Sequence, residues 1–361
     1  MGQAALDSRV QYLILFVTAR CNLLCKHCFY TDEILNWKSK KELTLDEYQK
    51  IAEKAGRVLQ VSLTGGEPFI RKDLGEIILA FHQRARTLFF NVTTNGLLDR
   101  QILSTLEALF SQAPGLSLRL GLSIDGFEEV HDLTRDKPGG FKQVLKTAQM
   151  LAPLRRRYPG FTVHVSTTLT KYNAAAICEF IDFVRNDMDV DAHYLGFIRG
   201  EVLDPQTKEV TLDDYWRATA HLKRRWIQKN KFQNVLNGVN ALMNSVNRYI
   251  LEGDRYFFPC VAGEKMLTID EEGKIKPCEI LEQKGVAPFI MGDLRQSDYD
   301  IYQAMATPTG RKIRQDILDS QCHCTFECAN QANVAYKPSN FVKALGLHLK
   351  QRLAQDGRTA S

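Results

Sequence analysis

Six short apolar segments alternate with amphipathic segments between residues 11 and 200, and this alternation constrains the fold more than any other feature of the chain. The strand-like segments cover residues 12–17, 58–63, 88–92, 116–124, 161–169 and 192–198. Repeated strand–helix units predict a parallel sheet with right-handed crossovers. Because six units are too few for a closed eightfold barrel, we predict an α/β fold with a partial, open (β/α)6 parallel barrel. Functional residues are then expected in the loops that follow the strands.

Helix boundaries are marked by local signals. Thr44 with Glu47 forms a capping-box pattern before an apolar stripe, and Gly56 ends that stripe. Asp73 with Glu76 repeats the pattern, and Asn173 is placed to cap the helix that follows it.

Beyond about residue 205 the strand–helix alternation stops. Residues 212–251 read as helical without proline, and MLTID, EEGK and IKPCEI in 266–280 read as a hairpin. The predicted organisation is a barrel at 9–203, a helical connector at 204–258, a small cysteine-bearing domain at 259–335 and a C-terminal helix and tail at 336–361.

Composition excludes several classes of protein. Of the 361 residues, 44% are hydrophobic, but no apolar run approaches the ~18 residues of a membrane span. The first residues lack a secretory signal pattern, so we expect a cytoplasmic protein without a membrane partner. The net charge of +5 gathers most densely at 155–157 and 223–225. These patches read as solvated helix ends, and we predict no nucleic-acid partner.

Nine cysteines are grouped along the chain, at 21, 25 and 28, at 178, and at 260, 278, 322, 324 and 328. In a reducing compartment, clustered cysteines bind metal more often than they form disulfides. Cys21, Cys25 and Cys28 follow the first strand, where three thiolates could hold three irons of a [4Fe–4S] cube and leave the fourth iron open. A zinc site that includes His27, or unrelated buried thiols, remain alternatives, since spacing alone does not separate them.

The surrounding motifs resemble those of the radical SAM superfamily. Cys-x3-Cys-x2-Cys after a first strand is similar to its signature, and Gly65, Gly66, Glu67 and Pro68 resemble its GGEP element after the second. The resemblance implies a SAM-binding [4Fe–4S] cluster and S-adenosylmethionine. The further SAM contacts that it implies follow the next strands: Asn95, Ser123, Asp125, Arg135 and Ile198. Glycines allow a ligand to approach the backbone closely, and Glu67 could accept from an ammonium group.

The distal cysteines resemble those of twitch and SPASM domains, which implies an auxiliary [4Fe–4S] cluster held by Cys260, Cys278 and two of Cys322, Cys324 and Cys328. The fuller SPASM pattern carries about seven cysteines for two clusters, and the five here suffice for one. One distal cysteine would be spare, or three ligands could leave an open iron. A zinc site with His323 is a further alternative. Cys178 is expected in the core.

The resemblance implies reductive cleavage of SAM to a 5′-deoxyadenosyl radical that abstracts hydrogen from a substrate, with electrons from a flavodoxin- or ferredoxin-type donor. The auxiliary cluster favours net oxidation or bond formation on a small metabolite or a peptide. A redox-neutral epimerase or rearrangement enzyme is one alternative, and a non-catalytic zinc or iron–sulfur scaffold is another.

The location of two helical segments is not determined by the sequence. The segment 212–251 could cover the barrel mouth or form an outer helix. For 341–353, core packing is favoured over docking at a membrane surface.

Overall fold

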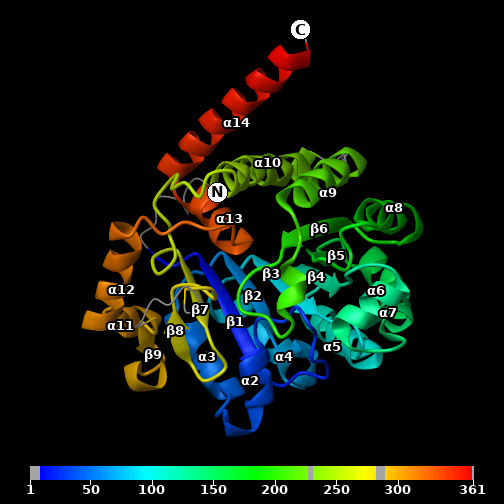
Figure 1. The fold of residues 1–361 in the computed structure, drawn as a ribbon. Helices are drawn as coiled ribbons and strands as arrows, with labels where there is room; N and C mark the ends of the chain where they lie inside the picture. The colour runs from blue at the N-terminus through cyan, green and yellow to red at the C-terminus, as the bar shows by residue number, and fades with distance from the viewer. Residues whose placement is uncertain (1–8, 227–230, 282–288, 360–361) are drawn as a thin grey trace.

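The computed structural model describes residues 9–226, 231–281 and 289–359, which fold around one nine-stranded sheet of order β6-β5-β4-β3-β2-β1-β7-β8-β9 (Figure 1). Strands β1 to β6 pair in parallel in chain order, and the sheet does not close. Their bounds are β1 Tyr12–Thr18, β2 Gln60–Gly65, β3 Phe89–Thr94, β4 Ser117–Ser123, β5 Phe161–Leu169 and β6 Ala192–Phe197. The predicted open barrel of six strand–helix units is confirmed.

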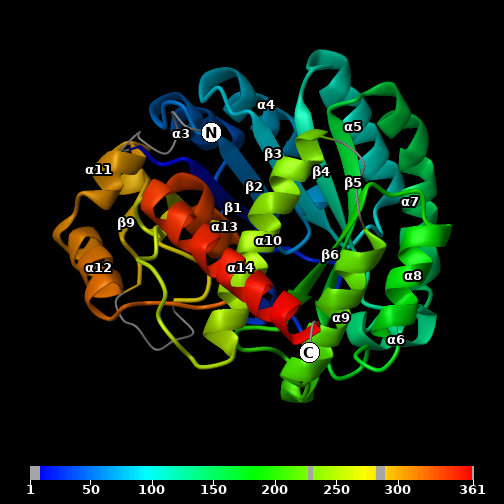
Figure 2. The same ribbon diagram turned by 90° about the horizontal axis from the view of Figure 1, so that it is seen from above.

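Helices cover the sheet on both sides. Figure 2 shows α3, α4, α5, α7 and α8 along its outer side, while α9, α10, α13 and α14 lie over the other side. The helix bounds are α2 Thr31–Leu35, α3 Leu45–Lys54, α4 Leu74–Arg84, α5 Asp99–Gln112, α6 Glu128–Arg135, α7 Gly140–Arg157, α8 Ile177–Asp187, α9 Leu212–Arg225, α10 Lys231–Leu251, α11 Ile301–Met305, α12 Pro308–Asp319, α13 Glu327–Tyr336 and α14 Pro338–Thr359. The segment predicted as one helix over 212–251 thus contains two helices, and residues 227–230 between them lie outside the described residues.

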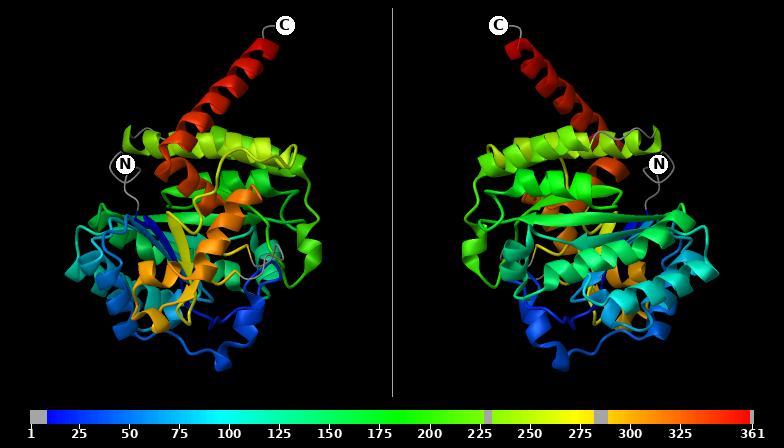
Figure 3. Two further views of the ribbon diagram at one scale, coloured as in Figure 1. Left: turned by 90° about the vertical axis from the view of Figure 1, so that its left-hand side faces the viewer. Right: turned by 90° about the vertical axis from the view of Figure 1, so that its right-hand side faces the viewer.

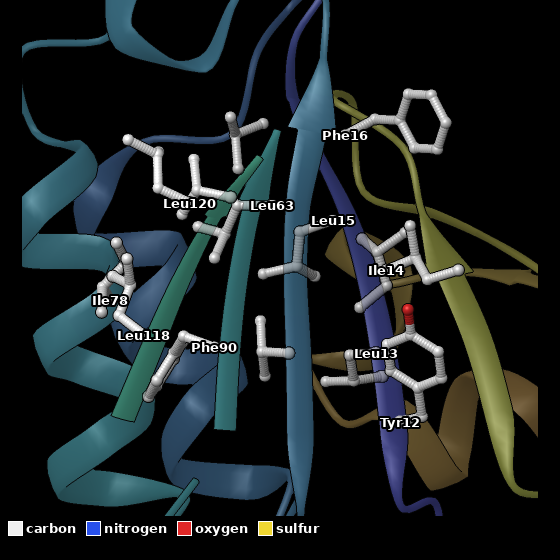
Figure 4. Packing of buried hydrophobic residues seen from close by; sticks show 14 of the residues in the cluster. Tyr12, Leu13, Ile14, Leu15, Phe16, Leu63, Ile78, Phe90, Leu118 and Leu120 are labelled. Carbon is white, nitrogen blue, oxygen red and sulfur yellow. The ribbon is translucent and has the colours of Figure 1, made fainter. Parts of the chain in front are cut away.

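The two faces of the sheet differ in chemistry. Alternate residues of the central strands β2, β3 and β4, such as Leu63, Val92 and Leu120, are fully buried on the face that meets the outer helices. Figure 4 shows Leu63 and Leu120 on this face. Their neighbours point to the opposite face, because side chains alternate along a strand. We call this opposite side the inner face; its central side chains are Ser62, Asn91, Arg119, His164, Ser166 and Tyr194. A strand with one apolar and one polar side indicates that the inner face borders a site rather than a core.

The hairpin of the distal segment joins the main sheet. Strand β7 (Met266–Ile269) pairs in parallel with β1, and β8 (Lys274–Lys276) and β9 (Gly292–Asp293) continue the sheet in antiparallel fashion. The hairpin itself was predicted from its sequence. Its parallel pairing with β1 was not, because a pairing that spans some 250 residues leaves no local signal.

Two of the three predicted helix starts need correction. Thr44 and Glu47 form the expected capping box. Asp73 occupies the N-cap position of α4 but makes no capping bond, because its carboxylate takes both donors of Arg71, at 2.9 and 2.6 Å. Asn173 caps no helix either: α8 begins at Ile177, and the Asn173 amide instead donates to the carbonyl oxygens of Asp125 and Thr168.

A second, smaller core joins α10, α13 and α14. Its buried members are Leu242, Met243, Val246, Ile250, Phe258, Val334 and Ala344. Helix α14 then projects away from the rest of the molecule (Figure 3). Among the described residues, no helix is long and apolar enough to cross a bilayer.

The favoured core packing of the C-terminal segment is wrong for four of its apolar residues. Phe341, Val342, Leu345 and Leu349 are 40–67% exposed. Because α14 projects, only the side that carries Ala344 reaches α10. The side chain of Leu353 lies outside the described residues, and docking at a membrane surface stays the less favoured alternative.

The basic patches lie where the sequence placed them. Arg155–Arg157 and Lys223–Arg225 form the last turns of α7 and α9, where positive charge interacts favourably with the helix dipole. Arg155 forms an ion pair with Asp189, so this patch is already partly neutralised.

Replacing Leu120 by alanine tests the outer core. Leu120 is fully buried at the centre of β4, and removing its side chain should lower the free energy of unfolding by about 2–5 kcal/mol. Leu35→Ala serves as the control, because Leu35 is 61% exposed and should change stability by less than about 0.5 kcal/mol. Urea unfolding followed by circular dichroism measures both, and equal effects would contradict this account of the core.

Candidate functional site

Cys21, Cys25 and Cys28 lie on one loop between β1 and α2. The Lys26 amide donates to the carbonyl of Thr134 at 2.9 Å, which ties the loop to the end of α6. Burial, followed by smaller electrostatic contributions that include neighbouring cysteines, raises the pKa of Cys21 to about 11 and that of Cys25 to about 12. The three thiols therefore share one small, desolvated volume.

The sulfur atoms already face hydrogen-bond donors. The Tyr30 amide donates to Sγ of Cys28 at 3.4 Å, and Nη1 of Arg135 lies 4.0 Å from Sγ of Cys25. Donors of this kind stabilise ligated thiolates and tune an iron–sulfur cluster. The donor set around the loop thus fits three thiolate ligands of a cluster.

Gly65 and Gly66 are required by the protein's own backbone. A Cβ on Gly65 would lie 2.4 Å from the Thr18 carbonyl oxygen, and one on Gly66 would lie 2.1 Å from the Arg20 carbonyl oxygen. The amides of Gly66 and Glu67 donate to these same two oxygens, each at 2.8 Å. The sequence predicted glycines that admit a ligand; in the structure they admit the start of the cysteine loop.

Glu67 joins three loops. Its carboxylate accepts from the Phe69 amide at 3.1 Å, from the Thr94 hydroxyl at 2.8 Å and from the Asn95 amide at 2.8 Å. Burial raises the pKa of Glu67 to about 7, although these donors oppose that shift. Both oxygens are thus engaged within the protein, which gives Glu67 a positioning role; Pro68 follows it in a buried 3-10 turn.

Asn95 contacts the cysteine loop directly. Its side-chain amide donates to Oδ1 of Asn22 at 2.7 Å, while its own Oδ1 accepts from the Leu97 amide. The loop after β3 therefore packs against the loop after β1, although β2 lies between the two strands.

Asp125 and Arg135 form a buried ion pair beside the loop. Nε of Arg135 donates to the Asp125 carboxylate at 2.8 Å, and the amide of Thr168 donates to the other oxygen at 3.0 Å. Asp125 is fully buried, and although burial raises its pKa, the charge of Arg135 holds it below the ordinary value. Arg135 is thus aimed at Cys25 by a fixed carboxylate.

His27 also approaches Asp125: its Nε2 lies 3.6 Å from Oδ2 of the carboxylate. Burial lowers the pKa of His27, so its neutral form is favoured. Its Nδ1 is buried and meets no partner within the described chain. A polar group of a bound ligand could satisfy this atom.

The remaining predicted SAM contacts lie at the same end of the sheet. Ser123 ends β4 on the inner face, and Ile198 is buried directly after β6. Next to it, Arg199 forms an ion pair with Glu327 of α13 and stacks over Phe326 at 4.6 Å. This pair links the barrel to the distal cysteine segment.

Four of the five distal cysteines form one group. Burial and then, in order, Cys260, Cys324 and Cys322 raise the pKa of Cys278, which places these thiols within electrostatic reach. Cys260, Cys322 and Cys324 also line a common hollow. We call Cys260, Cys278, Cys322 and Cys324 the distal quartet.

Cys328 stands apart from the distal quartet. Burial and then Glu279 raise its pKa to about 12, and its thiol contacts the hydroxyl of Tyr12 on β1. The next contributions to that shift come from Tyr12, Arg199 and Glu327. Cys178 lies half-buried on α8, packed against the main core as predicted.

The two histidines of the zinc alternatives lie near the two cysteine groups. His27 approaches Asp125. His323 lines the same hollow as Cys260, Cys322 and Cys324, and it contacts Asp254 and the carbonyl of Gln321. Over the parts of the chain that the structure describes, no three His, Cys, Asp or Glu side chains are close enough together to hold a single metal ion.

Three residues of the site were not predicted from the sequence: Asn22, His27 as a buried neighbour of Asp125, and Asn173 as a brace for that residue. Asn22 and His27 lie within the cysteine motif, so their position could have drawn attention. The sequence around Asn173 has the pattern of a helix cap, which does not indicate its contact with Asp125.

Comparison with known proteins gives one family model. Residues 15–184 match the model described as the Radical SAM superfamily. Molybdenum cofactor biosynthesis protein 1 of Drosophila melanogaster is 30% identical over 191 residues, which cover 52% of this chain and 32% of that protein. The antilisterial bacteriocin subtilosin biosynthesis protein AlbA of Bacillus subtilis (strain 168) is 24% identical, over 79% of this chain and 57% of that protein. GTP 3′,8-cyclase of Aquifex aeolicus is 26% identical, over 75% and 89%.

The chain therefore spans about a third of the first of these relatives and somewhat more than half of the second. Among solved structures, native anSMEcpe with bound AdoMet and Cp18Cys peptide aligns with a TM-score of 0.61 at 14% identity, over 98% of this chain and 100% of that one. Streptococcus suis SuiB aligns with a TM-score of 0.58 at 18% identity, over 85% and 68%. These likenesses establish a shared fold.

Gly66→Ala tests the contact between the first two loops. The added Cβ must displace the Arg20 carbonyl, so the cysteine loop should move and reconstituted iron should fall by about four atoms per chain, one cluster's worth. Gly115→Ala is the matched control, since nothing lies within 4 Å of its Cβ position. Iron and sulfide analysis after anaerobic reconstitution gives the result. Full iron content in Gly66→Ala would show that the loop tolerates displacement.

Proposed function

We propose that the chain, whose residues 15–184 match the Radical SAM superfamily model, is a radical SAM enzyme that cleaves S-adenosylmethionine reductively and abstracts hydrogen from a substrate. The observation that carries the proposal is the convergence of the loops after β1, β2 and β3 on Cys21, Cys25 and Cys28. A protein that only stored a cluster would not require this convergence.

Each loop residue has a separate task. Cys21, Cys25 and Cys28 would hold the cluster, and a bound cluster with SAM supplies the one-electron cleavage that yields a hydrogen-abstracting radical. Arg135, fixed by Asp125, presents a cation beside Cys25 that could meet a carboxylate of SAM. Backbone carbonyls near Gly65 could accept from an ammonium group, since Glu67 is engaged by its own protein donors.

We further propose that the distal quartet holds an auxiliary [4Fe–4S] cluster and that Cys328 is the spare thiol. The four thiols lie within reach of one another, and Cys328 is directed to Tyr12 instead. A second cluster can accept an electron, which favours net oxidation or bond formation. A flavodoxin- or ferredoxin-type protein would deliver electrons to the first cluster.

For the substrate, we favour a peptide over a small metabolite. One relative is named for bacteriocin biosynthesis, and one structure of the same fold contains a bound peptide. The open sheet with its polar inner face is consistent with an extended substrate.

The first test of the function is SAM cleavage. Reconstituted protein with dithionite should release 5′-deoxyadenosine, and a variant with Cys21, Cys25 and Cys28 replaced by alanine should lose at least about 100-fold of this activity, since no ligand remains for the cluster. Cys178→Ala is the control and should keep full activity. Zinc in place of iron, with no deoxyadenosine, would support the scaffold alternative. With substrate in D2O, solvent deuterium at the reacting carbon would indicate an epimerase.

The second test counts irons in the distal segment. Wild-type protein should contain about eight irons per chain, Cys324→Ala about four, and Cys328→Ala about eight. Removing a cysteine that binds the auxiliary cluster should release that cluster, whereas removing a cysteine that does not bind it should leave the iron content unchanged. Mössbauer spectroscopy confirms the cluster type. Loss of four irons in Cys328→Ala would place that residue among the ligands and contradict the assignment.

A further inference from the structure

The inner face of the sheet carries one arginine that the site described above does not use. Arg119, the third residue of β4, pairs in register with Asn91 on β3 and Thr162 on β5. Its guanidinium carbon lies 5.4 Å from the centre of the Tyr194 ring on β6. His164 of β5 meets the same ring edge-on at 4.8 Å between ring centres. Three strands thus bring a cation, a phenol and an imidazole together.

Arg119 differs from the other arginines of the interior. Arg71, Arg135 and Arg199 each form an ion pair, with Asp73, Asp125 and Glu327 respectively. Arg119 stacks on Tyr194. Across residues 9–226, 231–281 and 289–359 it forms no ion pair and no hydrogen bond. The N–H donors of this half-buried guanidinium are therefore available to an acceptor from a ligand.

His164 provides a second, independent sign of a missing ligand. It is 5% exposed, and its Nδ1 is buried without a partner in the described chain. Gly121 makes room for the ring, because a Cβ there would lie 2.8 Å from Nε2 of His164. The imidazole of His164 therefore fits at this position because residue 121 has no side chain.

We propose that Arg119, Tyr194 and His164 form a binding site for a single carboxylate of the substrate, an inference that rests on the proposed function. The planar guanidinium donates two parallel N–H groups to a carboxylate, and Tyr194 holds the guanidinium by stacking. His164 can add a donor from its unpaired ring nitrogen.

Charge selects a carboxylate over a polyphosphate. Among the described members of this cluster, Arg119 is the single cation, and no ion pair neutralises it. Burial and the nearby guanidinium hold the pKa of His164 well below its ordinary value, so the imidazole adds no positive charge. One cation matches a monoanion and leaves a nucleoside triphosphate largely uncompensated.

The position of Arg119 along β4 sets a minimum length for the substrate. Arg119 precedes Ser123 by four residues along β4, which corresponds to about 13 Å of strand. A substrate with its acid group at Arg119 and its reacting carbon near the cysteine loop would have to be several bonds long. An acidic side chain within a peptide satisfies this condition, as does a free acid of similar length.

A binding measurement on the full reconstituted chain tests the site without requiring turnover. Fluorine NMR titration compares 4-fluorophenylacetate with its uncharged amide and with 4-fluorobenzylphosphonate. The acid should bind at least 10-fold more tightly than the amide. Arg119→Gln should abolish that preference, and Arg119→Lys should restore part of it. Arg157→Gln is the matched control, because Arg157 stacks on Tyr158 at 5.3 Å on the outer surface, and it should leave the preference unchanged.

The outcomes are separable from those of the SAM-cleavage test. Three results would overturn the carboxylate site. The acid and the amide bind equally; the acid does not bind at millimolar concentration in up to 50-fold molar excess over protein; or Arg119→Gln keeps the preference for the acid. Tighter binding of the phosphonate would overturn it in favour of a phosphate site. Acid binding without deoxyadenosine formation would retain the site and reject the enzyme. A pair of short 4-fluorophenylalanine peptides, acetylated and C-terminally amidated, carries glutamate or glutamine and identifies the source. Tighter binding of the glutamate peptide than of both the glutamine peptide and 4-fluorophenylacetate indicates a peptide.

Discussion

The close backbone contact between the loops after β1 and β2 is the constraint on which the candidate site depends. Gly66 and Glu67 donate to the carbonyls of Thr18 and Arg20, and only glycine fits at Gly65 and Gly66. Without this contact the cysteine loop would lack its partner on one side. The same contact places Glu67 where it can accept from Thr94 and Asn95. Three loops thus become one rigid frame around the thiols.

The parallel sheet supplies this frame because all six strands end at the same edge. Its outer face is apolar and packs on α3 to α8, which provides the stability of the fold. Its inner face is polar, so the residues that do not stabilise the fold are available for a ligand. Arg119 and His164 lie among them, and their unused polar groups distinguish them from the satisfied ion pairs of the interior.

The distal segment is integrated with the barrel rather than merely attached to it. Strand β7 extends the sheet beside β1, and α13 approaches the inner face through Glu327 and Cys328. Two cysteine groups far apart in sequence are therefore positioned by neighbouring parts of one sheet.

The sequence by itself determined the alternation of strands and helices, the open six-unit barrel, the capping box at Thr44 and the placement of the first cysteines after β1. These features depend on local periodicity and on residues close together in the chain. Only the tertiary structure decided which distal cysteines lie together, that Glu67 and Asn173 brace loops, and that α14 exposes its apolar residues. It also decided that Arg119 stacks on Tyr194 and, within the described residues, forms no ion pair. Each of these depends on what a side chain meets across the fold, and a buried donor or a close backbone approach has no counterpart in the linear pattern of residues.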